Sequence, residues 1–398
     1  MIIGVVGKTN TGKSTFFKAA TLAEVEIENR PFVTIKPNLA IGYVKVECVD
    51  KEFNTKCNPK FGFCIDHERF IPVKLIDVAG LVPGAHLGKG LGLTFLDDLR
   101  EADVLIHVID ISGGTNEKGE PVEKGSYDPG KDIEFLEKEI DMWYYSILKR
   151  GWDKFSKQIM QEKKEVHKEL AKQLSALKVT EEMVKSCMKE LGLSQNPSEW
   201  KEEDLMNLAF KLRRITKPMI IAANKIDVPG AYELFLKVKE RFKDVTIIPC
   251  SAESELALRE AAKSKLINYV PGESDFEILK PEILNEKQKK ALEFIKKNVL
   301  EKYGKTGVQE ILNKAVFELL GYIVVYPVAN ETKLTDAEGN ILPDAFLLPK
   351  GSTVIDLAYK IHSDIGEKFN CAIDVRTKKR LGKDYVLKNG DVIKIMTS

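Results

Sequence analysis

An eight-residue run near the start of the chain has the residue types that bind a phosphate group. It reads Gly7-Lys8-Thr9-Asn10-Thr11-Gly12-Lys13-Ser14 and fits the pattern GxxxxGK[ST]. Glycines at its ends let successive backbone N–H groups close around a phosphate without a clash from Cβ. Lys13 is expected to reach the β and γ phosphates, and Ser14 to hold Mg²⁺. Thr15 opens the following helix, whose N-terminal dipole favours the same ligand. A tight turn without a ligand is the structural alternative.

Two further positions are predicted to act on the metal and the γ-phosphate. Asp77 directly follows an apolar run, where its carboxylate can hold Mg²⁺ through water, and Gly80 can offer its N–H to the γ-phosphate. This DxxG pattern is weak alone, because Asp and Gly are common in turns. Thr34 is the candidate for a threonine that contacts Mg²⁺ only when the γ-phosphate is present. An ordinary residue at the entry of a strand is the alternative for Thr34.

The run Asn224-Lys225-Ile226-Asp227 predicts which base the nucleotide carries. The Asp227 carboxylate can accept hydrogen bonds from the N1–H and the exocyclic amine of guanine. Adenine has no such pair of donors, so it would leave a buried carboxylate unpaired, which is costly. Ser251 and Ala252 are expected to complete the base pocket through a backbone N–H to the guanine carbonyl. The sequence therefore favours a guanine nucleotide.

The elements that must position these residues are short apolar runs rich in Val and Ile. Such runs predict buried strands of a mostly parallel α/β sheet, in which ligands bind at the carboxyl ends of strands. The candidate residues fall at those ends. The runs are Ile2 to Val6, Val73 to Ile76, Val104 to Ile109, Met219 to Ala223 and Val245 to Pro249.

The chain is long enough for several domains, and its pattern changes along its length. Residues 128–216 are dense in Lys and Glu and predict an inserted domain of two or three amphipathic helices. The nucleotide-binding domain then comprises residues 1–127 and 217–275. Residues 276–320 predict helices, and residues 321–398 a small α+β domain.

Composition bears on three questions: whether the protein binds nucleic acid, whether it contacts a membrane, and whether its cysteines bind metal. The 61 basic and 60 acidic residues give no overall charge that would favour nucleic acid, so a charged partner must bind locally. No long apolar segment or signal peptide is present, which predicts a cytoplasmic protein without membrane contact. Cys57, Cys64 and His67 raise the question of zinc, but without a CxxC pair or a clear fourth ligand, buried thiols are the favoured interpretation.

Longer stretches around these motifs resemble the Obg family of GTPases. Residues 77–96 look like its Gly-rich second switch, and residues 30–38 like its first switch, although Arg30 stands where the family usually has an aromatic residue. The helical insert and the segment 348–353, similar to a TGS domain, point to the YchF branch. The resemblance implies a Ras-like P-loop GTPase domain, a helical insert and a C-terminal ubiquitin-like (β-grasp) TGS domain. Many YchF-branch proteins lose the NKxD pattern and prefer ATP, whereas this chain keeps it.

The resemblance also bears on catalysis. Leu81 stands where Ras-like proteins place a water-orienting Gln, so slow GTP hydrolysis is expected. Asn10 matches an Asn that helps to hold K⁺ in potassium-activated GTPases, and potassium dependence is left open because Asn is also a common loop residue. His86 in the second switch is another candidate to orient water, although a solvated loop His is more common.

A basic cluster in the C-terminal domain is the candidate contact with RNA. Phosphate contacts of this kind give salt-sensitive binding, and a solvated turn is the alternative. The resemblance to translation-associated TGS proteins favours RNA or the ribosome as partner. The cluster consists of Arg376, Lys378, Lys379, Arg380 and Lys383.

The function expected from these residues is a regulatory GTPase that binds GTP or GDP with Mg²⁺. An ATP-preferring P-loop ATPase and an RNA-binding scaffold with a structural nucleotide remain alternatives. A P-loop kinase would need an acceptor pocket and has no use for the guanine motif.

Overall fold

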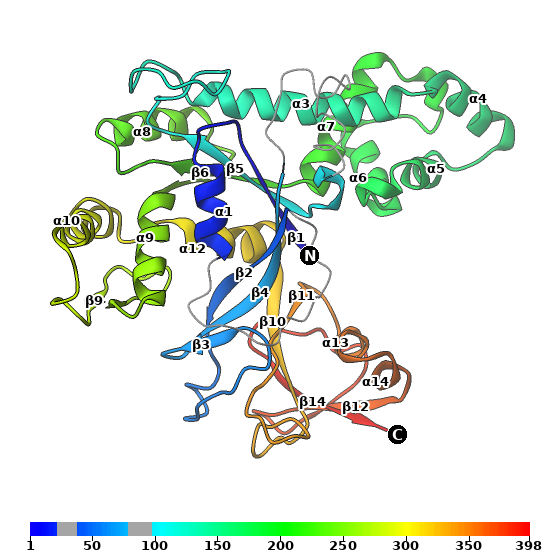
Figure 1. Cartoon of the computed structure of the whole chain (residues 1–398). Helices are drawn as coiled ribbons and strands as arrows, with labels where there is room; N and C mark the ends of the chain where they lie inside the picture. Colours follow the sequence, from blue (N-terminus) through cyan, green and yellow to red (C-terminus); the bar gives the residue numbers. More distant parts are fainter. Residues whose placement is uncertain (22–37, 79–97) are drawn as a thin grey trace. The chain divides into compact units, whose positions relative to one another are not determined.

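The computed structural model describes residues 1–21, 38–78 and 98–398 (Figure 1). The chain forms two compact units. The first comprises residues 1–18, 75–254 and 306–308, and the second residues 19–74, 255–305 and 309–398. Each unit is therefore assembled from segments far apart in the sequence, and the predicted nucleotide-binding domain contributes to both.

The first unit is built on the predicted parallel sheet. β1 (Ile2–Val6) pairs with β5 (Val104–Asp110), β5 with β6 (Met219–Asn224), and β6 with β7 (Ile247–Cys250), all in parallel. On the other side of β1 comes the end of β4 (Glu68–Asp77), which enters this unit at Leu75. Every residue of β5 is buried, in agreement with its largely apolar sequence. The α/β Ras-like fold is confirmed.

Helices flank this sheet and form the insert. α1 (Lys13–Thr21) follows β1, α8 (Ala231–Arg241) follows β6, and α9 (Ala252–Lys263) follows β7. The insert contains five α-helices, so the expectation of two or three was too low. They are α3 (Gly130–Lys149), α4 (Trp152–Glu162), α5 (Val166–Gln173), α6 (Glu181–Leu191) and α7 (Glu202–Thr216).

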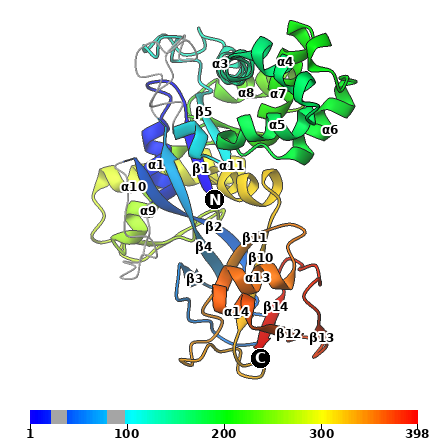
Figure 2. The ribbon, with the colours of Figure 1, turned by 90° about the vertical axis from the view of Figure 1, so that its right-hand side faces the viewer.

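Glycines separate some of these short helices. Gly151 lies between α3 and α4 and Gly192 ends α6, with φ of 73° and 65°, a backbone conformation that glycine adopts at little cost. α3 and α7 pack along each other (Figures 1 and 2). The insert helices share one apolar core with sheet residues such as Val6, Ile76 and Leu105. The insert is thus packed onto the sheet and is not a separately folded appendage.

The second unit contains the remaining strands and the C-terminal domain. β2 (Leu39–Glu47), β3 (Phe63–Ile65) and the first part of β4 form one sheet region, and β8 (Ile267–Asn268) pairs with β9 (Glu277–Ile278). The predicted helical segment contains α10 (Glu286–Ile295), α11 (Glu301–Tyr303) and α12 (Val308–Asn313), with π-helical turns at Lys296–Leu300 and Lys314–Leu319.

The C-terminal domain is a five-stranded sheet in the order β11-β10-β14-β12-β13 with a helix packed on it. Its central pair, β10 and β14, is parallel, and the other pairs are antiparallel. This agrees with the expected β-grasp architecture, although the short β13 and α14 were not predicted. The elements are β10 (Tyr322–Val328), β11 (Phe346–Pro349), α13 (Val354–Ile361), α14 (Ser363–Glu367), β12 (Phe369–Asp374), β13 (Arg380–Leu381) and β14 (Val392–Thr397).

Among the described residues, no helix is both long and apolar enough to cross a membrane.

Candidate nucleotide-binding site

The phosphate loop connects β1 to α1, and its two glycines are required by close contacts. A Cβ at Gly7 would lie 2.6 Å from the backbone oxygen of Val108. Gly12 has a φ of +88°, and a Cβ there would lie 2.2 Å from Nδ2 of Asn224. The N–H of Phe16 donates to the Gly12 carbonyl at 2.8 Å, which closes the first turn of α1. The loop therefore has the shape that a phosphate cradle needs.

Lys13 and Asp77 come from separate elements and meet at this loop. The Lys13 ammonium forms an ion pair with the Asp77 carboxylate at the end of β4. Ser14 is exposed in the first turn of α1, and Asp77 is only half-buried. The hydroxyl and the carboxylate are hard oxygen ligands, so Ser14 and Asp77 fit the Mg²⁺ that accompanies a bound nucleotide. Thr34, Gly80, Leu81 and His86 lie outside the described residues.

Two predicted loop residues have their side chains on the segment that follows β5. Lys8 forms an ion pair with the buried Asp132 at 2.7 Å and donates to the Thr115 carbonyl at 3.1 Å. Nδ2 of Asn10 donates to the Gly119 carbonyl at 2.8 Å. The backbone of this loop therefore remains the part that can face phosphate, while the Lys8 side chain attaches it to the insert. No sequence pattern predicted these partners.

Asn224 links the phosphate loop to the base side of the site. Its Nδ2 donates to the Thr11 carbonyl at 2.9 Å, and its Oδ1 accepts from the N–H of Ala252 at 3.0 Å. Ala252 is the first residue of α9, so one buried amide connects three elements. A backbone N–H of Ser251 or Ala252 was expected to face the guanine carbonyl. If it is the N–H of Ala252, a base that binds there must share or replace its hydrogen bond to Asn224.

Asp110, which the sequence analysis did not select, holds the second residue of the guanine motif. Lys225 donates to the Asp110 carboxylate at 2.8 Å and to the carbonyl of Asn10 at 2.7 Å. Ser112 and Thr115 also donate to this carboxylate. Burial opposes ionisation of Asp110, but the hydrogen bonds from Lys225, Ser112 and Thr115 outweigh it and lower the pKa. An acidic residue at the end of a buried strand is the signal that could have revealed it.

Replacing Asp110 with asparagine is expected to reduce the loss of stability in acid. A carboxylate whose pKa is lowered by folding stabilises the protein above its unfolded pKa, about 3.9, and this contribution disappears as the pH falls through the folded value. The wild type should therefore lose more of its thermal stability between pH 6 and acid than Asp110→Asn does. Asp128→Asn, in an exposed pair with Arg241, should behave as wild type. Equal acid sensitivity of all three proteins would contradict the assignment.

Asp227 and Ser251 stand near the end of β7. Asp227 is half-buried. Burial, and then the charge of Asp227, raise the pKa of the adjacent Cys250. The N–H of Ser251 donates to the Thr306 carbonyl at 2.9 Å. A Cβ at Gly307 would meet the Pro249 carbonyl oxygen at 2.2 Å, so a turn more than 50 residues further along supports this side of the site. Sequence reasoning missed Thr306 and Gly307.

Comparison with known families agrees with the geometry. Residues 2–142 match the family described as 50S ribosome-binding GTPase. Residues 222–330 match the G4 motif-containing domain of Obg-like GTPases of the YGR210-like type. Residues 338–397 match the TGS domain.

Whole-length relatives extend these matches. A GTP-binding protein of Methanocaldococcus jannaschii is 53% identical, with 100% of this chain and 99% of that protein covered. The crystal structure of a GTP-binding protein from Pyrococcus horikoshii has a TM-score of 0.80 at 42% identity, with both chains fully covered. The ribosome-binding ATPase YchF of Bacillus subtilis is 28% identical, with 98% and 97% covered. The chain therefore belongs to the YchF-related family of Obg-like GTPases.

Proposed function

We propose that this protein is a slowly hydrolysing GTPase that acts as a nucleotide-dependent switch on a ribosome or RNA partner in the cytoplasm. The observation that carries the choice of guanine is the arrangement of Asn224, Lys225 and Asp227. Asn224 and Lys225 hold the phosphate loop, and Asp227 follows them in the same turn with its carboxylate half-buried. In that place a carboxylate can accept the two guanine donors that adenine lacks.

In the proposed cycle, the residues of this chain bind and orient the nucleotide. The backbone of the phosphate loop and Lys13 hold the phosphates, and Ser14 and Asp77 would hold Mg²⁺, which neutralises charge on the phosphate oxygens. Thr34 and Gly80 would sense the γ-phosphate. With Leu81 in place of a water-orienting Gln, hydrolysis is expected to be slow.

Potassium is part of the proposal at Asn10. Its Nδ2 is used by the Gly119 carbonyl, so Oδ1 is the side-chain atom available to a cation. If K⁺ supplies charge at the phosphates, hydrolysis will be faster in KCl than in NaCl at equal ionic strength. Equal rates in the two salts would remove K⁺ from the mechanism.

The preference for guanine is tested by titration calorimetry with GDP and ADP in the presence of Mg²⁺. The wild type should bind GDP at least about 100-fold more tightly, because two hydrogen bonds to a charged acceptor contribute roughly 3 kcal/mol or more. Asp227→Ala should abolish the preference. Asp244→Ala, which removes an exposed carboxylate of the same unit, should leave it unchanged. If ADP binds as well as GDP, the ATP-preferring alternative replaces this proposal.

Asp227→Asn makes the same test sharper, because it exchanges one acceptor for a donor. Its amide can accept from N1–H and donate to a carbonyl at C2, which is the pattern of xanthine. The variant should therefore prefer XDP over GDP. Retention of GDP preference would show that Asp227 does not contact the base.

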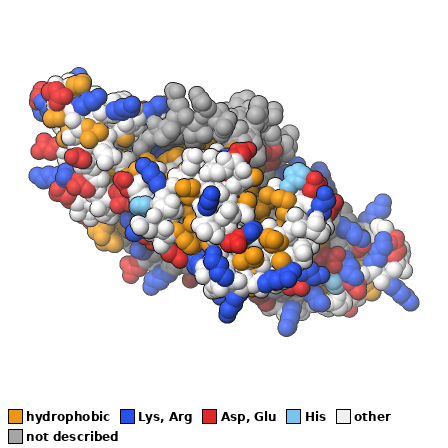
Figure 3. Space-filling model, turned by 90° about the horizontal axis from the view of Figure 1, so that it is seen from below, with side chains coloured by type: hydrophobic (Ala, Val, Ile, Leu, Met, Phe, Trp, Pro, Cys, Tyr) orange, Lys and Arg blue, Asp and Glu red, His pale blue; other side chains and the backbone are white. Residues whose placement is uncertain are grey.

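The proposed RNA contact rests on the basic cluster of the C-terminal domain. All five of its members are exposed. Arg376 is bound by Glu52 at 2.6 Å and 2.7 Å, so Lys379, Arg380 and Lys383 are the better candidates for phosphate. On the face that Figure 3 shows, basic side chains are interspersed with acidic ones. This favours RNA binding by a small basic cluster over binding by a broad basic surface. Co-sedimentation with ribosomes that depends on a GTP analogue would separate the switch from the scaffold alternative.

A further inference from the structure

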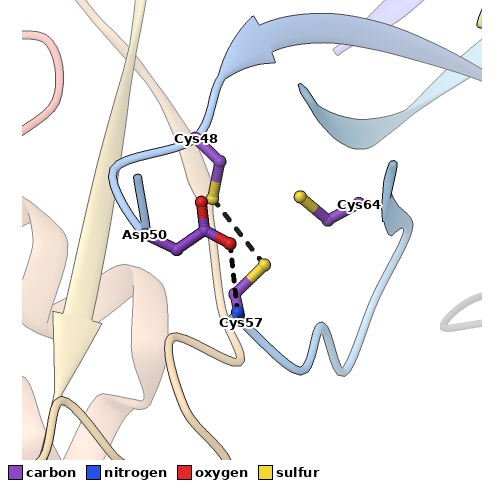
Figure 4. Close-up of side chains that lie close together, drawn as sticks. All are labelled: Cys48, Asp50, Cys57 and Cys64. Atoms are coloured by element: carbon purple, nitrogen blue, oxygen red, sulfur yellow. Dashed lines mark hydrogen bonds between the residues drawn. The ribbon is translucent and has the colours of Figure 1, made fainter. Parts of the chain in front are cut away.

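Three cysteines and one aspartate of the second unit converge on one point. Cys48 directly follows β2, Asp50 and Cys57 lie in the loop between β2 and β3, and Cys64 is in β3 (Figure 4). One ligand atom from each of the four residues lies within 4.8 Å of all the others. Cys48, Asp50 and Cys57 are buried, and Cys64 is half-buried. The group thus combines soft ligands with shielding from solvent.

The sulfur geometry fits one tetrahedral metal ion. The Sγ atoms of Cys48 and Cys57 are 3.7 Å apart, much further than the roughly 2.05 Å of a disulfide. Two sulfurs bound at about 2.3 Å to a tetrahedral Zn²⁺ are separated by about 3.8 Å. In a [4Fe–4S] cluster each cysteine binds a different iron, and in a [2Fe–2S] cluster each iron binds two cysteines, so the four ligands of either cluster are spread more widely than those of a single ion. The observed separation therefore favours a mononuclear site.

A tight hairpin turn and backbone hydrogen bonds hold the ligands in place. Asp66 and His67 both have positive φ, 49° and 66°, as in the two-residue turns that join adjacent strands. This turn joins β3 to β4 and sets Cys64 opposite Arg69. The Cys48 N–H donates to the carbonyl of His67 at 2.7 Å. The two cysteine-bearing strand ends are therefore aligned by the backbone itself.

Asp50 has the contacts of an oriented ligand. Its Oδ2 accepts the N–H of Cys57 at 3.0 Å, and its Oδ1 lies 2.9 Å from Nδ1 of His67. A carboxylate has about four lone-pair positions, so both oxygens keep capacity for a metal bond. Hydrogen bonds of this kind orient the carboxylate and imidazole ligands of metal ions in proteins. His67 thus acts behind Asp50 and not in place of it.

Arg69 gives an independent sign that negative charge belongs here. Its side chain is fully buried and donates to the carbonyls of Leu342 and Pro343 at 3.0 Å and 2.7 Å. Within the described residues it forms no ion pair with a carboxylate, and its Nε has no hydrogen-bond partner. Asp344 lies near enough to interact electrostatically with Arg69 but forms no ion pair with it, and a buried guanidinium without a direct counter-ion is destabilising. A metal with three thiolates and one carboxylate carries net negative charge, and Arg69 is paired across the hairpin with Cys64.

We propose that Cys48, Asp50, Cys57 and Cys64 bind one structural Zn²⁺ ion. Four protein ligands leave no open position for a substrate, which is the pattern of a structural site. The loop that the ion would close also carries contacts to the C-terminal domain in the same unit. Glu52 binds Arg376, and the N–H groups of Asn58 and Lys60 donate to carbonyls of residues 341 and 343. The ion would therefore stabilise the loop that contacts the C-terminal domain.

The test is elemental analysis of the full-length, untagged protein purified without chelator. The wild type should contain about one zinc per chain. Cys57→Ser and Cys64→Ser should lose at least about 80% of it, whereas Cys371→Ser, which alters a buried cysteine of the same unit outside the cluster, should retain it. A folded wild type without metal, or with an equivalent of iron, would overturn the proposal.

A second measurement does not depend on the folding of any variant. Alkylation of wild type should modify Cys48, Cys57 and Cys64 only after a chelator removes the ion, while the reactivity of Cys371 stays the same. Replacement of zinc by Co²⁺ should give the visible absorption of a tetrahedral thiolate site, and Asp50→Asn should shift those bands. A disulfide between Cys48 and Cys57 in the purified protein, or alkylation unaffected by the chelator, would contradict the assignment.

Discussion

Replacing Gly12 with alanine is expected to weaken GDP binding about 30-fold or more. Alanine must adopt the left-handed φ of this position, and its Cβ would lie 2.2 Å from Nδ2 of Asn224, so the amide must move off the Thr11 carbonyl. The backbone conformation costs about 1–2 kcal/mol and the lost buried hydrogen bond about 1–3 kcal/mol. Titration calorimetry with GDP and Mg²⁺ measures the loss.

Gly192→Ala is the matched control for the Gly12 variant. Gly192 also has a positive φ, 65°, but nothing lies within 4 Å of its added Cβ. This variant should lower stability through the backbone alone and leave GDP affinity unchanged. An Asn224→Ala background lacks the Nδ2 atom that the added Cβ would meet. In that background Gly12→Ala should weaken GDP binding only by the cost of its backbone conformation. Strict additivity of the two substitutions would show that the contact with Asn224 is not the cause.

Asn224→Ala is expected to destabilise the protein even in the absence of nucleotide. The substitution leaves the Thr11 carbonyl and the Ala252 N–H without the amide that satisfies both. Each buried group left unpaired costs about 1–3 kcal/mol, so for the two groups we expect a loss of about 2–6 kcal/mol in the free energy of unfolding. Urea denaturation of the nucleotide-free protein measures it. GDP affinity should also fall, because the loop and α9 are no longer connected.

Two variants distinguish this role from direct contact with the base. Asn224→Asp keeps an acceptor for the Ala252 N–H but sets a carboxylate oxygen against the Thr11 carbonyl, so it should also destabilise the free protein. Asp227 is half-buried and its proposed partner is the guanine base. Asp227→Ala should therefore reduce GDP affinity with little effect on the stability of the free protein. If Asn224→Ala leaves the free protein as stable as wild type, Asn224 does not bridge these elements.

Much of the fold and the core of the site could be predicted from local patterns. The buried strands β1, β5 and β6 were recognised within one residue, because their apolar runs end abruptly at polar residues. The phosphate loop was recognised because only glycine permits its backbone. The insert was recognised as helical, but its five short helices were not separated, since periodic apolar spacing continues across short breaks.

Local sequence was enough to predict which residues bind phosphate, Mg²⁺ and guanine, since these proposed roles depend on residue type and on position at a strand end. Only the tertiary structure decided what supports them, because Asp110, Thr306 and Gly307 reach the site through contacts between distant segments. The same holds for Cys48, Asp50, Cys57 and Cys64, whose spacing fits no short zinc motif. Their convergence depends on a hairpin turn and on the pairing of strands, and neither is encoded by the spacing of cysteines alone.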